Sequence, residues 1–234
     1  MIQVVRLVKK ICLIMNDNSY CGREYISALQ RNNIFIDIIL IGVNDSFDEL
    51  EDKRCGGLWS PLEQSNYSSK FCISRFNSLN DPLFIRHLIE ANYSLGIQGG
   101  TGIINNNCLS KFSEGILNFH PGDLPFYRGC SAPEYQYLHG NKIISSCHFL
   151  SKGIDDGDLV DSKILNVDTL SYFSFRASIY PMTSEFVLSV IKRWLTGEDL
   201  ARKPQDESLA IYNKYIGDNA IDKMIKNWGK PKEL

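Results

Sequence analysis

The sequence predicts an α/β fold with an open sheet of mostly parallel strands. Short, nearly continuous apolar runs recur along the chain, as expected of strands that are buried on both faces of a parallel sheet. Segments with helical spacing separate these runs, which favours alternating strands and helices joined by short connections. The chain has 234 residues, of which 44% are hydrophobic and 22% charged, so one large domain with a buried core is expected.

The first unit is a strand, a helix and a second strand. Residues 10–15 (KICLIM) form the first apolar run, and a polar turn follows directly. A helical pattern covers residues 22–30, and two asparagines then precede a second apolar run at residues 34–41 (IFIDIILI). This order predicts a βαβ unit, the building block of a Rossmann-like parallel sheet.

The next segment, residues 42–69, is polar and acidic and has no recognisable period. Its most acidic part is the stretch from Asp45 to Asp52, and two adjacent glycines and a proline follow that stretch. Long connections without periodic structure are often functional loops, so we expect an excursion from the sheet and a candidate lid.

A second helix and strand follow this excursion. Asp81 is placed to cap a helix whose first residue is Pro82, which predicts a helix over residues 82–93 and a strand at residues 94–98. Further strands are predicted at residues 115–119, 143–150 and 159–167.

The last part of the chain is predicted to be a helix and a mixed tail. The predicted helix covers residues 183–195, with Val187, Val190, Ile191 and Trp194 on one stripe. The tail has a candidate strand at residues 208–212 and a short helix at residues 220–228. We therefore expect a main domain over residues 1–196 and a C-terminal extension over residues 197–234, which is a candidate dimerisation element.

Composition excludes several classes of function. The formal net charge of −2 provides no global field that would attract nucleic acid. Lys9 and Lys10 interrupt the apolar N-terminus, and no apolar run is long enough to span a membrane, so neither a signal peptide nor a membrane segment is expected. The seven cysteines are odd in number and lack a C-x-x-C pair, which favours a reducing cytoplasm over a disulfide framework or a metal site.

The densest group of chemically special residues is the segment 117–129 (LNFHPGDLPFYRG), directly after a predicted strand. Side chains two residues apart lie on one face of a strand, so Asn118 and His120 are expected to project together. The carboxyl ends of strands in open α/β sheets are where ligands bind. The alternative is that Asn118 caps a turn and that His120 is a buried histidine with satisfied hydrogen bonds.

A second polar segment, residues 153–158 (GIDDGD), lies between two apolar runs. Three close carboxylates are costly unless they are solvated or used, and the two glycines allow unusual backbone angles. The alternative is a solvated hairpin turn.

The run from Leu117 to Val160 resembles the signature block of the formyltetrahydrofolate-dependent formyltransferases. The matching features, in order, are Asn-x-His-Pro, Leu-Pro, an aromatic-Arg-Gly triplet, a nearby proline and a later Asp-x-Gly turn. A weaker likeness covers residues 10–215, including the segment 99–104 and the pairs of motifs at 205–207 and 210–212. The resemblance implies the formyltransferase fold.

The resemblance places the family's catalytic residues on Asn118, His120 and Asp155, which leaves Asp156 and Asp158 as bystanders. It implies that an amine attacks the formyl carbon of 10-formyltetrahydrofolate without a covalent enzyme intermediate. Asn118 and protonated His120 would then donate hydrogen bonds to the developing oxyanion, and Asp155 would hold the imidazolium and help to relay a proton.

By the same resemblance, the cofactor contacts are Gly102, Ile104 and Asp155, with backbone groups recognising the pterin ring. No metal is implied. A different class of hypothesis is a non-catalytic folate-binding module, against which the presence of all three catalytic residues argues.

The family has three well-known acceptors. The methionyl-tRNA enzymes carry an additional C-terminal barrel and a basic patch, neither of which is expected here. In the glycinamide ribonucleotide enzymes a glycine-rich phosphate loop follows the first strand, whereas this chain has Asn16-Asp17-Asn18-Ser19 there. The sugar N-formyltransferases remain, which favours a nucleotide-linked amino sugar, dTDP-4-amino-4,6-dideoxyglucose, used in surface polysaccharide synthesis.

Four residues are candidate contacts to this acceptor: Asn18, Ser19, Tyr127 and Arg128. For the first two the alternative is a helix N-cap, and Arg128 could instead brace its loop against a buried carboxylate. A homodimer formed through residues 208–212 is expected because symmetric dimers are the commonest soluble oligomers.

Overall fold

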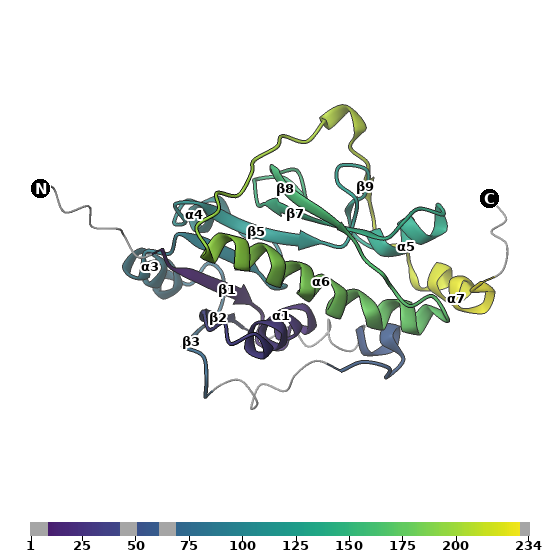
Figure 1. Ribbon diagram of the computed structural model, residues 1–234, viewed down its shortest axis with the longest axis horizontal. Coiled ribbons are helices and arrows are strands. Elements are labelled where there is room, and N and C mark those ends of the chain that lie inside the picture. The colour runs from purple at the N-terminus through teal and green to yellow at the C-terminus, as the bar shows by residue number, and fades with distance from the viewer. Residues whose placement is uncertain (1–8, 43–50, 61–68, 230–234) are drawn as a thin grey trace, which may run out of the picture.

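The chain is described by a computed structural model that covers residues 9–42, 51–60 and 69–229. Its centre is a seven-stranded sheet with the order β3-β2-β1-β4-β5-β7-β8 (Figure 1). The strands are β1 (Ile11–Met15), β2 (Asp37–Ile41), β3 (Ile73–Phe76), β4 (Leu95–Gln98), β5 (Gly115–His120), β7 (Ile144–Phe149) and β8 (Leu159–Ile164). The strands from β3 to β5 are parallel, and β7 and β8 are antiparallel to their neighbours, which confirms the predicted open, mostly parallel sheet.

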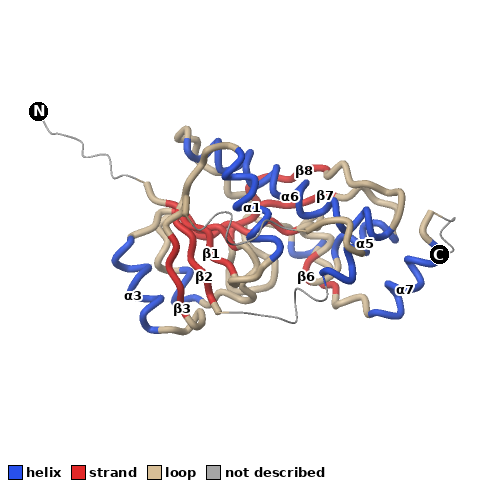
Figure 2. Tube along the Cα trace, turned by 90° about the horizontal axis from the view of Figure 1, so that it is seen from below, coloured by secondary structure: helices blue, strands red, loops and turns tan. Residues whose placement is uncertain are grey.

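Helices cover both faces of the sheet, which is why β1 is apolar at every position. Ile11, Leu13 and Met15 pack with α1 (Tyr20–Arg31) and α6 (Tyr172–Leu195). Cys12 and Ile14 point the other way, towards α3 (Pro82–Ala91) and α4 (Asn106–Leu109). Figure 2 shows α1 and α6 on one side of the strands and α3 on the other.

Helix boundaries follow local capping chemistry. The predicted start of α3 is confirmed, because the Asp81 carboxylate accepts a hydrogen bond from the Leu83 N–H at 2.9 Å and Pro82 is the first helical residue. The predicted start of α6 was wrong. Ser171 and Ser174 form a capping box, and the helix then continues through Pro181, which the sequence pattern treats as a breaker. The predicted apolar stripe of α6, from Val187 to Trp194, is buried as expected.

Several short elements were not predicted, among them β3, α4, the two-residue β6 (Arg128–Gly129) and α5 (Ala132–Leu138). The predicted strand at residues 208–212 is largely wrong, since residues Glu207–Leu209 form a 3-10 helix and only β9 (Tyr212–Asn213) is a strand. Such short elements carry too few residues to show a period. The terminal helix is confirmed as α7 (Asp218–Asn227).

The chain after α6 returns across the sheet to the loop that follows β5. It leaves the end of α6 near α4, arches over β8 and reaches β9 before it descends to α7 (Figure 1). Lys203 exchanges two backbone hydrogen bonds with Leu159 at 2.8 and 2.9 Å, and β9 pairs in parallel with β6. The C-terminal residues therefore lie against the segment that was singled out from sequence.

The structure describes part of the acidic excursion. Residues 43–50 and 61–68 lie outside the described residues, whereas residues 51–55 are helical. Glu51 is buried and accepts a 2.8 Å ion-paired hydrogen bond from Arg176 of α6, whose guanidinium also lies 3.4 Å from Glu134 of α5. Trp59 stacks on Tyr180 with ring centroids 5.1 Å apart. This part of the excursion is anchored to α6.

Within the described ranges, none of the helices combines the length and the apolar character that a membrane crossing requires.

Candidate active site

Two polar side chains stand at the end of β5. Asn118 and His120 project from one face of this strand, while Leu117 and Phe119 point into the core with 0% and 3% exposure. The predicted sharing of one face by Asn118 and His120 is confirmed. His120 is buried and Asn118 is half-buried, so the amide is the more accessible of the two groups.

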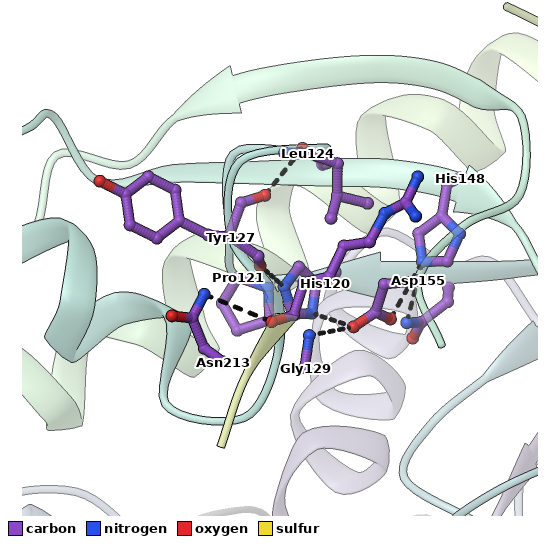
Figure 3. A network of polar contacts seen from close by, with 12 residues as sticks. His120, Pro121, Leu124, Tyr127, Gly129, His148, Asp155 and Asn213 are labelled. Atoms are coloured by element: carbon purple, nitrogen blue, oxygen red, sulfur yellow. Dashed lines mark hydrogen bonds and ion pairs between the residues drawn. The ribbon is translucent and has the colours of Figure 1, made fainter. Parts of the chain in front are cut away.

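Asp155 joins them from the loop between β7 and β8. One carboxylate oxygen of Asp155 lies 3.5 Å from His120 Nδ1 and accepts a 2.8 Å hydrogen bond from the Gly129 N–H. The other oxygen lies 3.5 Å from His148 Nε2. Figure 3 shows the Asp155 carboxylate between the two imidazole rings. The structure therefore brings together Asn118 and His120 of β5 and Asp155, which lies beyond β7 in the sequence.

His148 is a site residue that the sequence analysis missed. The antiparallel register sets it directly opposite Asn118, and its Nε2 lies 3.2 Å from the Asn118 amide nitrogen. Its Nδ1 donates to the Phe149 carbonyl at 3.0 Å, so in the neutral ring Nε2 can accept from Asn118. The only signal in sequence was an ionisable residue within a run predicted to be a strand, and the strand register was needed to give it a partner.

Both ring nitrogens of His120 face hydrogen-bond acceptors. Nε2 donates to the Tyr127 carbonyl at 2.6 Å, and Nδ1 faces Asp155. Only the imidazolium satisfies both acceptors. Burial nevertheless lowers the pKa of His120 below its ordinary value, while Asp155 and the Tyr127 carbonyl oppose that shift. Burial thus favours the neutral ring, whereas the two acceptors are placed to bind the imidazolium.

Asp155 is ionised in the same environment. Burial alone would raise the pKa of its carboxyl group, but the nearby imidazoles of His120 and His148 and the hydrogen bond from the Gly129 N–H outweigh burial and lower it to about 2. The side chain is 12% exposed. The site thus holds one carboxylate between two imidazoles, next to an amide donor.

Arg128 braces the loop that follows β5, and its side chain is not free to bind the amine substrate. Its side chain is fully buried, and all five of its N–H donors have protein partners. These partners are Gln205, Glu207 and Tyr212. No donor of Arg128 is left for a substrate, so the expected substrate contact is wrong. The alternative of a bracing residue is confirmed, except that the carboxylate it meets, that of Glu207, is 65% exposed and not buried.

Tyr127 is also tied into the protein. Its hydroxyl accepts from Asn141 at 2.6 Å and lies 2.9 Å from His139 Nδ1. One side of the ring lines an open cavity of about 520 Å³ that Phe126 and Lys142 also line. Its expected contact with the acceptor stays a prediction.

In the turn after β1, one of the two candidate substrate contacts has a structural role. Ser19 is the N-cap of α1, where its hydroxyl accepts from the Gly22 N–H at 3.3 Å, and it is only 3% exposed. The capping alternative is therefore confirmed for Ser19, and its contact with a substrate stays a prediction. The Asn18 carbonyl accepts from Arg23 at 3.1 Å, and its side chain stays a predicted substrate contact.

The predicted cofactor segment lies one strand away. Because β4 pairs in parallel with β5, residues 99–104 leave the sheet at the same edge as His120. Gly102 is exposed with φ +78°, and its carbonyl accepts from Gln98 at 2.5 Å. Ile104 is 5% exposed and packs in the core beneath this segment. Their contacts with a folate stay a prediction.

Curated relatives resemble this chain over the same region. The methionyl-tRNA formyltransferase of Syntrophomonas wolfei is 30% identical over 131 residues, which cover 55% of this chain and 41% of that protein. The methionyl-tRNA formyltransferase of Buchnera aphidicola from Acyrthosiphon pisum is 23% identical over 219 residues, or 92% of this chain and 68% of that protein. The chain thus spans between about two fifths and two thirds of the length of these relatives.

Solved structures share the fold at low identity. A sugar N-formyltransferase from Shewanella sp FDAARGOS_354 superposes with a TM-score of 0.61 at 15% identity, covering 87% of this chain and 76% of that one. The formyltransferase PseJ from Anoxybacillus kamchatkensis, in complex with UDP-4,6-dideoxy-4-formamido-L-AltNAc and tetrahydrofolate, has a TM-score of 0.54 at 14% identity and covers 84% of this chain and 95% of that one.

A family model for formyl transferases matches residues 9–172, which include β1, the β5 strand with Asn118 and His120, and the Asp155 loop. This region holds each of the four residues that meet at the sheet edge. On the strength of that match, the chain belongs to the formyl transferase family.

Proposed function

We propose that this protein transfers a formyl group from 10-formyltetrahydrofolate to the amino group of a nucleotide-linked amino sugar. The observation that carries the proposal is the meeting of Asn118, His120 and Asp155 at the carboxyl edge of the parallel strands, where open α/β sheets bind their ligands. Family membership supports the reaction class.

Asn118 has the chemistry to stabilise the transition state. Its amide has two N–H donors, of which His148 engages one at 3.2 Å. The other can donate to the formyl oxygen as negative charge develops there, and fixed donors of this kind commonly lower the barrier of acyl transfer. The bond that forms joins the amine nitrogen to the formyl carbon, and the bond that breaks joins that carbon to the donor nitrogen N10.

Asp155 and His120 can move the proton that the amine must lose. Burial lowers the pKa of His120 and so favours the neutral ring, the form that can accept this proton. The Asp155 carboxylate, 3.5 Å away, then stabilises the imidazolium. Returning the proton to N10 of the folate completes the exchange, and the side chains regain their starting state.

The formyl donor would lie along residues 99–104. The exposed, positive-φ Gly102 lets a planar ring approach the backbone closely. Tetrahydrofolate in the PseJ complex supports this choice of donor. We assign Gly102, Ile104 and Asp155 to the donor, and Asn18 and Tyr127 to the acceptor.

The charge near the site favours a small acceptor over a polynucleotide. The loop that carries Asp155 also carries Asp156 and Asp158, and the buried Arg128 is neutralised by Glu207. A tRNA partner needs a row of exposed cations against its phosphates. The sugar-modifying names of two structural neighbours point in the same direction.

Initiator methionyl-tRNA is a second candidate acceptor, because the curated relatives described above carry that activity in their names. A panel of acceptors separates the two. Purified protein and 10-formyltetrahydrofolate are incubated with dTDP-amino sugars, UDP-amino sugars, glycinamide ribonucleotide and methionyl-tRNA, and mass spectrometry detects the added formyl group. Asn118→Ala serves as the inactive control.

A formylated nucleotide sugar supports the proposal, and a formylated methionyl-tRNA replaces it with the second candidate. Binding of tetrahydrofolate by calorimetry without any formylated product would instead indicate a non-catalytic folate-binding module.

We also propose a homodimer and a C-terminal unit that begins at residue 197. Ile211 and Tyr212 are each 56% exposed, although Tyr212 belongs to β9. The surface beside β9 is therefore apolar and can pack against a second copy of the chain. A monomeric mass in light scattering at micromolar concentration would contradict the dimer.

A further inference from the structure

Gln205 bridges the Asp155 loop and Arg128. Its side-chain NH₂ donates to the carbonyl of Asp155 at 2.8 Å and to the carbonyl of Gly157 at 2.7 Å. Its side-chain oxygen accepts from Arg128 Nε at 3.2 Å and Nη2 at 2.9 Å. Because a guanidinium only donates and a carbonyl only accepts, this is the one orientation of the amide that satisfies all four groups.

The Asp155 loop needs such support. Asp155 has φ +53°, a left-handed conformation that costs a residue with a Cβ free energy and persists only where the surroundings hold it. The two carbonyls that Gln205 binds lie on either side of Asp156, so one side chain fixes the backbone across the turn. The amide of Gln205 therefore holds the backbone from which the Asp155 carboxylate projects.

Several contacts hold the Arg128 end of this bridge. Arg128 is fully buried, donates to both carboxylate oxygens of Glu207 at 2.6 and 2.9 Å, and donates to the Tyr212 hydroxyl oxygen at 2.7 Å. The next residue, Gly129, donates its N–H to the Asp155 carboxylate. The backbone and the carboxylate of Asp155 are thus both held by the Arg128–Gly129 strand, one through Gln205 and the other directly.

We propose that Gln205 is a positioning residue for formyl transfer, which acts by fixing the Asp155 backbone so that the carboxylate stays between His120 and His148. This role extends beyond the acceptor proposed above and does not depend on which amine is used. Gln205 itself touches neither the imidazoles nor Asn118.

Loss of the Gln205 bridge should change the pKa of His120, an effect that is not expected if Gln205 only stabilises the fold. If the Asp155 carboxylate moves away from His120, the charge that favours the imidazolium weakens and the pKa of His120 falls further. The titration of His120 therefore reports the position of Asp155. The chain contains four histidines, so their ring signals can be resolved by NMR.

The experiment compares Gln205→Met with Ser208→Ala. Methionine keeps the length of the side chain without its hydrogen bonds, whereas Ser208→Ala removes a 2.6 Å hydrogen bond to Asp206 in the same segment without touching the Asp155 loop. We expect Gln205→Met to lower kcat by about 10- to 100-fold, as displacements near 1 Å do, and to lower the NMR-measured pKa of His120. Ser208→Ala should change neither.

The same substitution is then made in an Asp155→Asn background. If Gln205 acts through Asp155, Gln205→Met has no further effect there on kcat or on the His120 titration. The proposal would be overturned if Gln205→Met had the kcat and the His120 titration of the wild type. It would also be overturned if Gln205→Met lowered kcat as much in the Asp155→Asn background as it does in the wild type.

A second variant covers the case in which Gln205→Met does not fold. Gln205→Glu keeps the acceptor for Arg128 but sets an oxygen against the Asp155 and Gly157 carbonyls, so it should lower kcat in the same way. An unchanged kcat in this variant would contradict the role. If no acceptor in the panel is formylated, the NMR titration decides the proposal alone, so its failure is distinguishable from failure of the proposed acceptor.

Discussion

Replacing Gly122 with alanine tests whether the position of the His120 ring limits turnover. A Cβ at residue 122 would lie 2.5 Å from His120 Nε2 and 2.7 Å from the Tyr127 carbonyl oxygen. Those two atoms form the 2.6 Å hydrogen bond that orients the ring. The added methyl group would therefore press against both partners of one bond, and one of them is backbone.

The magnitude follows from these distances. Non-bonded heavy atoms approach comfortably to about 3.5 Å, so the ring or the loop must yield by about 1 Å. Misplacement by about 1 Å near reacting groups costs about 10²-fold in rate. This loss corresponds to about 2.7 kcal/mol of activation free energy. Overpacking at a buried site also costs about 1–3 kcal/mol of folding free energy.

The assay measures kcat with the acceptor that the panel identifies, together with the NMR signal of the His120 ring and the thermal unfolding midpoint. The matched control is Gly197→Ala, at the end of α6, where φ is +92° and a Cβ meets no atom within 4 Å. It strains the backbone without approaching His120. A folded Gly122→Ala with kcat within about threefold of the wild type would refute the argument, because no transition-state stabilisation would then have been lost.

The remaining predictions concern stability. In the folded protein the pKa values of His120 and Asp155 are both below those of the unfolded chain, which are about 6.5 and about 3.9. The unfolded state therefore binds more protons in acid. The free energy of unfolding should fall as the pH drops below about 6.5, and again between about pH 4 and about pH 2. Denaturant titrations across this range check the sign, and greater stability in acid would contradict it. Arg176→Met leaves two buried carboxylates without the guanidinium they share, and should lower the free energy of unfolding by about 3–5 kcal/mol in urea titrations; a loss below about 1 kcal/mol would mean that the pair is not desolvated. Ser171→Ala removes the cap of α6 and should cost about 1 kcal/mol with kcat unchanged, and a fall in kcat would link that cap to the site.

Features set by local chemistry could be predicted from sequence. The apolar run of β1 predicts a strand covered on both faces, and the Asp81-Pro82 pair predicts the first turn of α3. Alternation along β5 predicts that Asn118 and His120 share a face. Each of these inferences uses residues within a few positions of one another.

Features that depend on distant partners could not be predicted. His148 becomes a neighbour of Asn118 only through the β5–β7 register, which no local pattern determines. Arg128 is taken up by residues of the C-terminal segment, so its apparent availability for a substrate was misleading. The start of α6 was missed because the packing of the helix overrides the usual effect of its internal proline.

The route of the C-terminal segment has a consequence for synthesis of the protein. A chain that ends at Gly197 contains every strand of the seven-stranded sheet and all four residues of the polar cluster, yet it lacks the amide and the carboxylate that lock Arg128 to the Asp155 turn. Domains emerge from the ribosome with the N-terminal part first, so the sheet can be complete before the site is rigid. A nascent chain, or one terminated at Gly197, would then have the polar cluster assembled but not held rigid. Full activity would require the residues that bind Arg128 and the Asp155 turn, which are synthesised later.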